Sequence, residues 1–283
     1  MTAVGSAGDD SMAAATPWLR QVRANAQATL ATLMRPPRRA LLWPSAAQLA
    51  LFVVGGAILV LAVMVQIDGW SLAHVRKLPI SLVEAFNRFT DLGKGGVFLW
   101  PLGLVLVALA LIDTPAMPRS ARLVLAAWSV RLGFVFTAIA LPSLFATIIK
   151  RIIGRARPFV DGTDPFLYAP FGWRVDYASL PSGHATTAFA ALVAIGSIFP
   201  QARALMWIYA VLIALSRVVV TAHHPSDVVA AAFVGAGGAW LVRQWFSARG
   251  LGFAVTAEGA IRPMPGPGLP RIIKALARRL HAA

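Results

Sequence analysis

The sequence predicts an all-α fold, a transmembrane bundle of six helices. Of the 283 residues, 58% are hydrophobic and only 13% are charged, whereas soluble domains carry roughly 25% charged residues. Uncharged stretches that are apolar on all sides recur along the chain, as in membrane helices, rather than alternating like barrel strands. The sequence contains no cysteine, which excludes a disulfide-stapled secreted domain, and its hydrophobicity excludes a disordered chain.

Six stretches are expected to cross the membrane, because a spanning helix needs about 20 mostly apolar residues. The third stretch contains a single charge, Arg131, and the fifth contains only Arg217, near its end. A charge within a span is costly and usually functional, yet no role is evident for Arg131. The six stretches are residues 40–67, 95–112, 123–149, 185–201, 204–222 and 228–242, the last extended by Trp245 and Phe246.

The spans define a membrane domain of residues 45–246 between two tails. Residues 1–44 are expected to form a mobile basic tail that lacks the features of a signal peptide. Residues 247–283 are expected to form a Pro-rich, basic tail, with an amphipathic turn over residues 271–280 at the membrane surface. Six spans place both tails on one side, and the segments on that side carry most of the Lys and Arg residues outside the spans. The positive-inside rule then predicts cytoplasmic termini.

The chain is strongly basic, with 26 Lys and Arg residues against 11 Asp and Glu residues and a net charge of +15. Such an excess indicates an anionic partner. Three classes fit this description: a nucleic acid, an anionic lipid and an anionic substrate. Many of the basic residues flank the apolar stretches, and no block of interleaved aromatic and basic residues is found. The expected partners are therefore the bilayer and an anionic substrate rather than nucleic acid.

Three polar clusters lie at helix ends that the six-span topology places on one membrane face. The first is KRIIGRARP at residues 150–158, after the third span, and the second is PSGH at residues 181–184, before the fourth. The third cluster, at residues 216–227, reads SR-x5-H-x3-D and joins the fifth span to the sixth. Topology alone therefore predicts that these clusters converge.

The residue types in the clusters suit the binding of a doubly charged anion. Lys150, Arg157 and Arg217 supply three cations that could clamp such a group. Ser182 and Gly183 open a helix, where free backbone N–H groups and the helix dipole favour an anion, and glycine allows a close approach.

Two histidines and one carboxylate complete the clusters. An imidazole nucleophile needs one free nitrogen, so its other nitrogen must carry a proton that is held by an acceptor. Asp227, four residues after His223, can be that acceptor. The pair follows the logic of a nucleophile that is oriented by a neighbouring carboxylate.

These residues resemble the motifs of the type 2 phosphatidic acid phosphatase family, in its membrane lipid phosphatase branch, which is related to the vanadium haloperoxidases. The family pattern is K-x6-RP, then PSGH, then SR-x5-H-x3-D, and every defined position is matched. The resemblance covers about residues 45–246 and implies an active site at the outer, membrane-facing helix ends. The matched residues are Lys150, Arg157, Pro158, Pro181, Ser182, Gly183, His184, Ser216, Arg217, His223 and Asp227.

The resemblance also implies roles for eight of these residues. His223 would attack phosphorus and form a phosphohistidine, Asp227 would orient it, and His184 would protonate the leaving oxygen and then activate water. The phosphoryl oxygens would be held by Lys150, Arg157, Ser182, Gly183 and Arg217. Three fixed cations could replace a metal ion, and no acidic cluster suggests a metal site, so activity without metal or cofactor is expected.

The implied function is hydrolysis of a lipid phosphate or diphosphate by an integral membrane phosphatase. Undecaprenyl diphosphate and lipid A are the leading substrates, with phosphatidylglycerol phosphate and phosphatidic acid also open. The expected location is a bacterial inner membrane with the site facing the periplasm. Two alternatives are a vanadate-dependent haloperoxidase and a protein that binds or moves lipid phosphates without turnover.

Three neighbours of the motif positions carry weaker expectations. Arg151 and Arg155 are expected to be solvated or to face lipid headgroups, as most charges beside a span do. His224 adjoins the expected nucleophile at a position where the family usually has an aromatic residue. The spacing from the SR pair selects His223 rather than His224.

Overall fold

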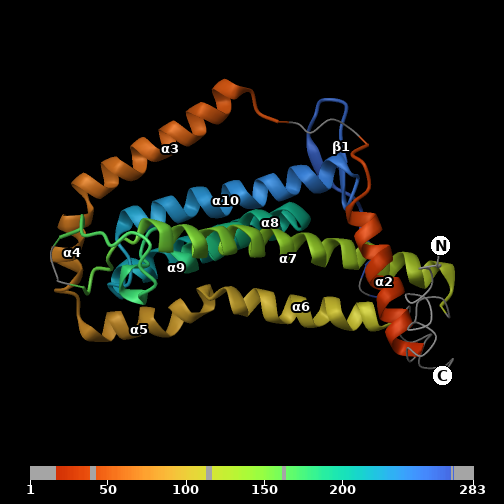
Figure 1. Cartoon of the computed structure of the whole chain (residues 1–283), viewed down its shortest axis with the longest axis horizontal. Coiled ribbons are helices and arrows are strands. Elements are labelled where there is room, and N and C mark those ends of the chain that lie inside the picture. Colours follow the sequence, from red (N-terminus) through yellow and green to blue (C-terminus); the bar gives the residue numbers. More distant parts are fainter. Residues whose placement is uncertain (1–16, 39–42, 113–116, 161–163, 269, 271–283) are drawn as a thin grey trace, which may run out of the picture.

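The structure, a computed structural model, describes residues 17–38, 43–112, 117–160, 164–268 and 270. It confirms the predicted all-α class, because every stretch expected to cross the membrane contains a helix. These helices lie side by side in an elongated bundle, with α3 crossing one face (Figure 1). Their bounds are α3 Ala46–Gln66, α6 Gly95–Leu111, α7 Arg119–Ile153, α8 Gly183–Ile198, α9 Arg203–Val219 and α10 Pro225–Ala248.

Shorter elements connect the long helices. The connection from α3 to α6 contains α4 (Asp68–Val75), α5 (Ile80–Thr90) and the 3-10 turn η1 (Asp91–Gly93). Two further 3-10 turns, η2 (Val175–Tyr177) and η3 (Pro200–Ala202), precede α8 and α9 respectively. α5 packs against α9 and runs nearly in line with α6 (Figure 1).

The count of six spanning helices is approximate. Five helical segments in the described part of the chain are long and apolar enough to cross a membrane, and one of them, Ile80–Leu111, joins α5 to α6. The exception is α8, which has only 16 residues. α8 contacts α7, α9 and α10 and is mostly buried, so it is a central helix surrounded by protein rather than by lipid. A helix in that position can be shorter than the hydrocarbon core.

Small residues allow α8 to pack closely against α10. A side chain at Gly235 of α10 would place its Cβ atom 2.4 Å from the carbonyl oxygen of Thr186 and 3.0 Å from the amide nitrogen of Ala190. Both contacts are with backbone, which cannot move aside without displacing the helix. Gly235 is therefore required for the helix contact that carries the start of α8 against α10.

Arg131 has a structural role that the sequence did not reveal. Its side chain is 7% exposed, and it donates hydrogen bonds of 2.8 Å to the carbonyl oxygens of Ala127 and Met264. Ala127 lies one turn earlier in α7, whereas Met264 follows the second strand of a C-terminal hairpin. The buried cation therefore ties the hairpin to the bundle.

The C-terminal segment is more ordered than the predicted tail. Strands β1 (Phe253–Val255) and β2 (Ile261–Pro263) pair in antiparallel fashion after α10. Phe253 is fully buried, and its ring lies 4.8 Å from that of Phe134 on α7, edge to face. Residues 253–255 and 261–263 are thus strands within the predicted tail, while the turn expected over residues 271–280 lies outside the described residues.

The N-terminal segment also contains structure. Helix α2 (Pro17–Leu33) occupies part of the region expected to be a mobile tail. The side chain of Asn25 donates hydrogen bonds of 2.6 Å and 3.0 Å to the carbonyl oxygens of Ala110 and Ile112, at the end of α6. The boundaries of the membrane domain at residues 45 and 246 stay predictions, and α10 continues to Ala248.

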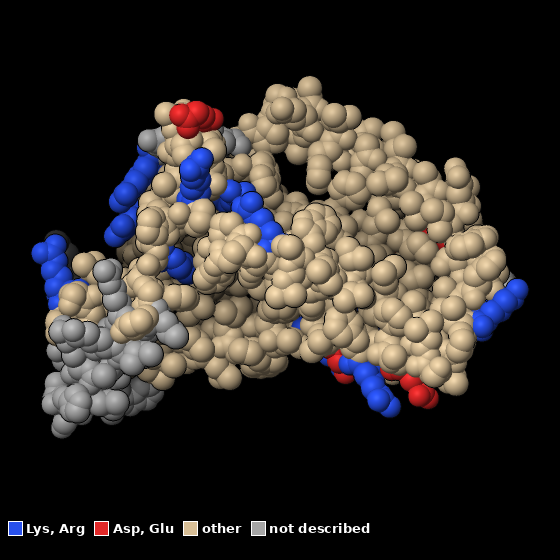
Figure 2. All heavy atoms as spheres, turned by 180° about the vertical axis from the view of Figure 1, so that it is seen from behind, with Lys and Arg blue, Asp and Glu red and all other residues tan. Residues whose placement is uncertain are grey.

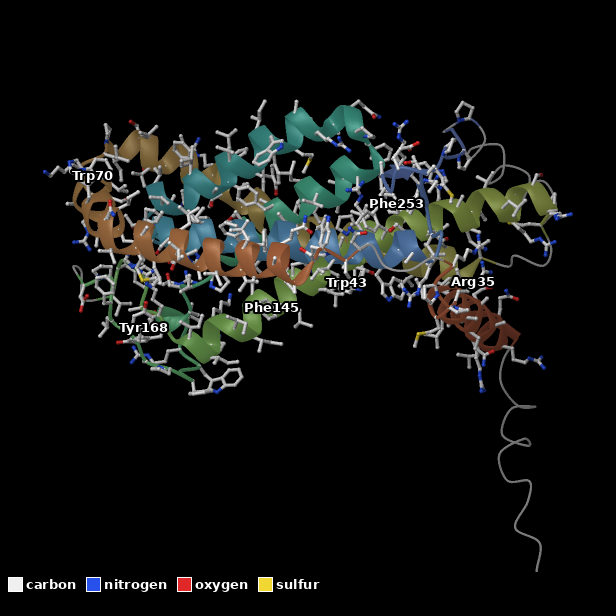
Figure 3. All side chains as sticks on the ribbon, turned by 90° about the horizontal axis from the view of Figure 1, so that it is seen from above. Arg35, Trp43, Trp70, Phe145, Tyr168 and Phe253 are labelled. Atoms are coloured by element: carbon white, nitrogen blue, oxygen red, sulfur yellow. The ribbon has the colours of Figure 1, made fainter. Side chains whose placement is uncertain are left out.

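The ends of the bundle differ from its middle. The face in Figure 2 carries most of its Lys and Arg residues toward the two ends of the long axis, with a largely uncharged surface between them. The hairpin and α2 lie at one end, and α4 with the connection from α7 to α8 lies at the other (Figure 1). From above, Arg35 and Phe253 mark the first end, and Trp70 and Tyr168 mark the second (Figure 3).

Candidate active site

The three clusters meet at the end of the bundle that contains α4. The first cluster follows from the end of α7, where Gly154 adopts a left-handed conformation (φ 65°) and turns the chain back. Any other residue at position 154 would place its Cβ atom 1.9 Å from the carbonyl oxygen of Ala169. The second cluster begins α8, and the third forms the loop between α9 and α10.

His223 and Asp227 form a buried pair across the start of α10. Their side chains are 3% and 0% exposed, and His223 Nδ1 lies 3.6 Å from Asp227 Oδ2. The Ser179 hydroxyl donates a 2.5 Å hydrogen bond to the same carboxylate oxygen and lies 3.4 Å from His223 Nδ1. With acceptors on its Nδ1 side, the ring fits the tautomer that carries its proton there. Nε2 is then the nitrogen with a free lone pair.

The surroundings of His223 keep its ring neutral. Burial lowers the pKa of His223 to about 4, and the positive charges of Arg157 and Arg217 act in the same direction, while Asp227 opposes them. At neutral pH the ring therefore lacks a second proton. A neutral imidazole has the lone pair that a nucleophile needs.

Several polar atoms near this pair have no protein partner. The hydroxyl of Ser182, Nε of Arg157 and Nε of Arg217 are buried without a hydrogen-bond partner among the described residues. Unpaired buried donors are rare in folded proteins, because each costs about 1–3 kcal/mol. Three of them from three segments indicate a site for an anion that accepts their hydrogen bonds.

The start of α8 is part of the same anion site. Ser182 is the N-cap residue of α8, so Gly183 and His184 lie in its first turn, where backbone N–H groups are free. A side chain at Gly183 would place its Cβ atom 3.6 Å from Nζ of Lys150, which shows how closely the cation approaches the helix end. His184 follows Gly183 in this first turn, and the charges of Arg217 and His223 act on its ring.

Arg217 is held by residues outside the three clusters. Its Nη1 donates a 2.6 Å hydrogen bond to the hydroxyl of Thr90, at the end of α5, and that hydroxyl lies 2.8 Å from the hydroxyl of Ser216. The carbonyl oxygen of Arg217 also accepts bonds from the amides of Ala222 and His223. The same residue thus orients its own cation and folds the loop that carries His223.

Arg155 does not have the solvated position expected from the sequence. Its side chain is fully buried, with Nη1 2.7 Å from Asp227 Oδ1 and Nη2 2.7 Å from Asp68 Oδ2. Burial disfavours its charge, but the carboxylates of Asp227 and Asp68 outweigh this and raise the pKa of Arg155. The expectation was wrong because spacing within a motif does not reveal which neighbour turns inward. Arg151, in contrast, donates a hydrogen bond to the carbonyl oxygen of Trp173 in an exposed position.

Sequence reasoning missed three residues that support the site: Asp68, Thr90 and Ser179. Asp68 begins α4, directly after the first span, and an acidic residue at that border is the one available signal. Thr90 and Ser179 have no distinguishing sequence pattern. Their roles come from contacts with Arg217 and Asp227, which are remote in the chain.

His224 has a different task from His223. It is the N-cap residue of α10, and its backbone N–H donates a 2.9 Å hydrogen bond to Asp227 Oδ2. Its side chain takes part in the reciprocal cap at the same helix start. Burial lowers the pKa of His224. This capping position agrees with the choice of His223 as the partner of Asp227.

The described residues contain no group of three or more His, Asp or Glu side chains arranged to hold a metal ion. The two buried carboxylates beside the site, Asp68 and Asp227, share the guanidinium of Arg155 instead. Activity without a metal stays a prediction.

Comparison with known proteins agrees with the motifs. Residues 131–251 match the model of the PAP2 superfamily. The chain contains a PAP2 superfamily domain. The domain includes all three clusters, from Lys150 to Asp227, and with the apolar helices it identifies an integral membrane protein.

Two curated relatives share the central part of the chain. The Lipid A 1-phosphatase of Rhizobium johnstonii is 38% identical over 129 residues, which cover 45% of this chain and 52% of that protein. The Lipid A 1-phosphatase of Rhizobium etli is 36% identical over 129 residues, which cover 45% of this chain and 55% of that protein. The chain therefore spans about half the length of the curated relatives that it matches.

Two solved structures are similar over a larger share of the chain. The crystal structure of Aquifex aeolicus LpxE is 21% identical and covers 60% of this chain and 91% of its own, with a TM-score of 0.44. The crystal structure of a transmembrane PAP2 type phosphatidylglycerolphosphate phosphatase from Bacillus subtilis is 22% identical, covers 68% and 92%, and has a TM-score of 0.48.

Proposed function

We propose that this PAP2 domain protein is a membrane phosphatase that hydrolyses a lipid phosphate or diphosphate through a phosphohistidine. The observation that carries the proposal is the position of His223. Its Nδ1 side is occupied by Asp227 and Ser179, and buried, unpaired donors of Ser182 and Arg217 surround the same site. A neutral imidazole beside an anion site is the arrangement that phosphoryl transfer to histidine requires.

In the first proposed step, the Nε2 lone pair of His223 forms a bond to phosphorus while the bond from phosphorus to the lipid oxygen breaks. Protonated His184 gives its proton to the leaving oxygen. Asp227 stabilises the positive charge that develops on the ring. Lys150, Arg157, Arg217 and the first turn of α8 would hold the phosphoryl oxygens.

In the second proposed step, neutral His184 takes a proton from water as the water oxygen attacks phosphorus. The bond from Nε2 to phosphorus then breaks, inorganic phosphate leaves, and both histidines return to their starting states. Each step has one attacking and one leaving group, and because water is the nucleophile of the second step, no second nucleophilic side chain is needed.

Lipid A is the substrate to test first, because both curated relatives are named Lipid A 1-phosphatase. These relatives match less than half of this chain, so undecaprenyl diphosphate, phosphatidylglycerol phosphate and phosphatidic acid belong in the same panel. The site residues contact only a phosphoryl group in the proposed mechanism. The lipid tail must therefore be identified by experiment.

We infer a bacterial inner membrane, with cytoplasmic termini and a site that faces the periplasm. The site lies at the opposite end of the bundle from α2 and the C-terminal hairpin (Figure 1). The larger share of Lys and Arg on the side of the tails supports this orientation. Labelling of single cysteines placed in the α7–α8 connection and in the hairpin, in intact cells, tests it.

The proposed activity is tested by phosphate release from the purified protein in detergent with excess EDTA. Wild-type protein and His223→Ala are compared on the lipid panel. Release by the wild type alone supports a metal-independent phosphatase. If the folded protein binds a lipid phosphate but releases phosphate from none of the lipids, the result would contradict the proposal and favour a binding or transport protein. Bromide oxidation with added vanadate would instead favour a haloperoxidase.

A further inference from the structure

A buried chain of charges connects the helix after the first span to the candidate nucleophile. Asp68, Arg155 and Asp227 are all fully buried. Arg155 bridges the two carboxylates, with both nitrogen–oxygen distances at 2.7 Å. Asp227 in turn lies 3.6 Å from Nδ1 of His223. The four side chains therefore lie in the spatial order Asp68, Arg155, Asp227, His223, although they come from three separate segments of the chain.

Asp68 is also attached to the start of α10. Its Oδ1 accepts a 3.0 Å hydrogen bond from the amide of Ser226, and its Oδ2 accepts a 2.5 Å bond from the Ser226 hydroxyl. That hydroxyl accepts a 2.6 Å bond from Arg155. Asp68 thus fixes both the guanidinium and the residue directly before Asp227.

The remaining donors of Arg155 are also satisfied. Its Nε and Nη2 donate to the carbonyl oxygen of Pro165, at 3.1 Å and 2.8 Å. Both edges of the guanidinium are therefore held, and it cannot rotate away from Asp227 without losing several bonds. Because the guanidinium is planar and bonds to both carboxylates, the position of Asp68 helps to fix the position of Asp227.

The buried network of Asp68, Arg155 and Asp227 also carries a net charge. Two carboxylates and one guanidinium carry one net negative charge, whereas Arg155 with Asp227 alone would be neutral. A buried ion pair is often no more stable than apolar residues of the same size, so stability alone does not explain three buried charges. A net negative charge behind His223 favours the positive ring that forms when its Nε2 is phosphorylated.

We propose that Asp68 is a positioning residue for the reaction, which acts on His223 through Arg155 and Asp227 and keeps this network negatively charged. The inference rests on the proposed phosphatase function. Asp68 lies outside residues 131–251 of the PAP2 domain. The segment between α3 and α5 is therefore part of the functional unit.

The charges around His223 determine in which direction its titration should shift when Asp68 is replaced. Asp227 faces its Nδ1 side, the positive charges of Arg157 and Arg217 act on it, and His184 at the start of α8 also interacts with it electrostatically. The neighbouring His224 caps α10. None of these groups is replaced in Asp68→Asn, so a shift in the titration of His223 reports the loss of the Asp68 carboxylate and its contacts.

The test compares Asp68→Asn, Asp68→Glu and the control Asp164→Asn. Asp164 is an exposed acid in the α7–α8 connection, whose Oδ1 accepts a hydrogen bond from the amide of Phe166. We expect Asp68→Asn to lower kcat about tenfold or more, with KM changed by less than about threefold, because orientation of a nucleophile acts in the transition state. Asp68→Glu, which keeps the charge, should recover part of kcat, and Asp164→Asn should match the wild type.

A second readout does not depend on turnover. Diethyl pyrocarbonate modifies neutral imidazole, so its pH-dependent rate at His223, followed by mass spectrometry of the peptide, reports the titration of that ring. We expect the midpoint in Asp68→Asn to move to lower pH, because a negative charge that stabilises the protonated ring is lost. Asp68→Glu and Asp164→Asn should keep the wild-type midpoint.

The outcomes separate this inference from the proposed function. A wild-type midpoint for Asp68→Asn, with or without loss of thermal stability, would overturn the inference and leave Asp68 a structural residue. An unchanged kcat would overturn it as well. If the wild type releases no phosphate, the proposed function fails, and the modification midpoint alone decides whether Asp68 acts on His223.

Discussion

Nδ1 of His223 lies 3.6 Å from Oδ2 of Asp227, and both side chains are buried. This contact leaves Nε2 as the reactive edge of the ring and keeps the carboxylate behind it. The hydroxyl of Ser179 stands between the two groups, 2.5 Å from the carboxylate and 3.4 Å from the ring nitrogen. Active-site hydrogen bonds often shorten when substrate binds. The geometry therefore suits the proposed role of His223 as a nucleophile that Asp227 orients.

Loss of the imidazole should remove turnover but keep the fold. His223→Ala is expected to reduce kcat more than about a thousandfold, because the proposed covalent intermediate forms on its imidazole. Phosphate release under saturating substrate measures the effect. The control is His74→Ala, since His74 is exposed on α4. Activity of His223→Ala within tenfold of the wild type would contradict a phosphohistidine on this residue.

We expect Arg217 to contribute both to substrate binding and to stabilisation of the transition state. Arg217→Lys loses the hydrogen bond to Thr90 and the planar donor set around the phosphoryl group. A charge-assisted hydrogen bond contributes about 1.5–3 kcal/mol, so kcat/KM should fall about 10- to 200-fold. Inhibition by inorganic phosphate should weaken in parallel. The control is Arg174→Lys, because the Arg174 side chain is 76% exposed, and equal losses in both variants would reject a specific role for Arg217.

Activity should fall on the acid side at a lower pH than the titration of an ordinary histidine would produce. Burial lowers the pKa of His223 to about 4, so the ring stays neutral until the pH falls toward that value. The attack requires neutral His223, and kcat/KM should therefore fall only below about pH 5. An acid limb near 6.5, the ordinary value for histidine, would contradict the buried environment of His223.

Arg131 should stabilise the C-terminal hairpin without affecting the site. Arg131→Met removes the 2.8 Å hydrogen bond to the carbonyl oxygen of Met264. We expect faster proteolysis between Ala248 and Met264, because the hairpin loses its tie to α7. The rate of phosphate release should stay within about twofold of the wild type, since the hairpin and the site lie at opposite ends (Figure 1). Unchanged proteolysis would show that other contacts, such as the packing of Phe253 and the hydrogen bond from Arg243 to the carbonyl oxygen of Ile261, hold the hairpin.

Packing of α8 against α10 should depend on one glycine. Gly235→Ala is expected to lower the unfolding temperature by several degrees, because its Cβ atom would lie 2.4 Å from the carbonyl oxygen of Thr186. The matched control is Gly55→Ala in α3, where a Cβ atom would meet nothing within 4 Å. That change should be neutral or stabilising, because alanine is the better helix former. Equal unfolding temperatures for the two variants would contradict the close contact.

The sequence by itself determined the helices and the convergence of the three clusters. Long apolar stretches predict helices because backbone groups in lipid must bond within their own segment. The alternation of spans then places the ends of α7 and α9 on the same face as the start of α8. These are properties of local composition and chain order, which can be read without knowing any contact between remote residues.

Only the tertiary structure decided which neighbours complete the site. Arg151 and Arg155 have the same charge and lie four residues apart, yet one bonds near the surface and the other is fully buried between Asp68 and Asp227. The burial of a charge depends on partners that arrive from distant segments, and their approach leaves no mark in spacing. For the same reason, the enclosure of α8 and the tie from Arg131 to Met264 followed from packing rather than from hydrophobicity.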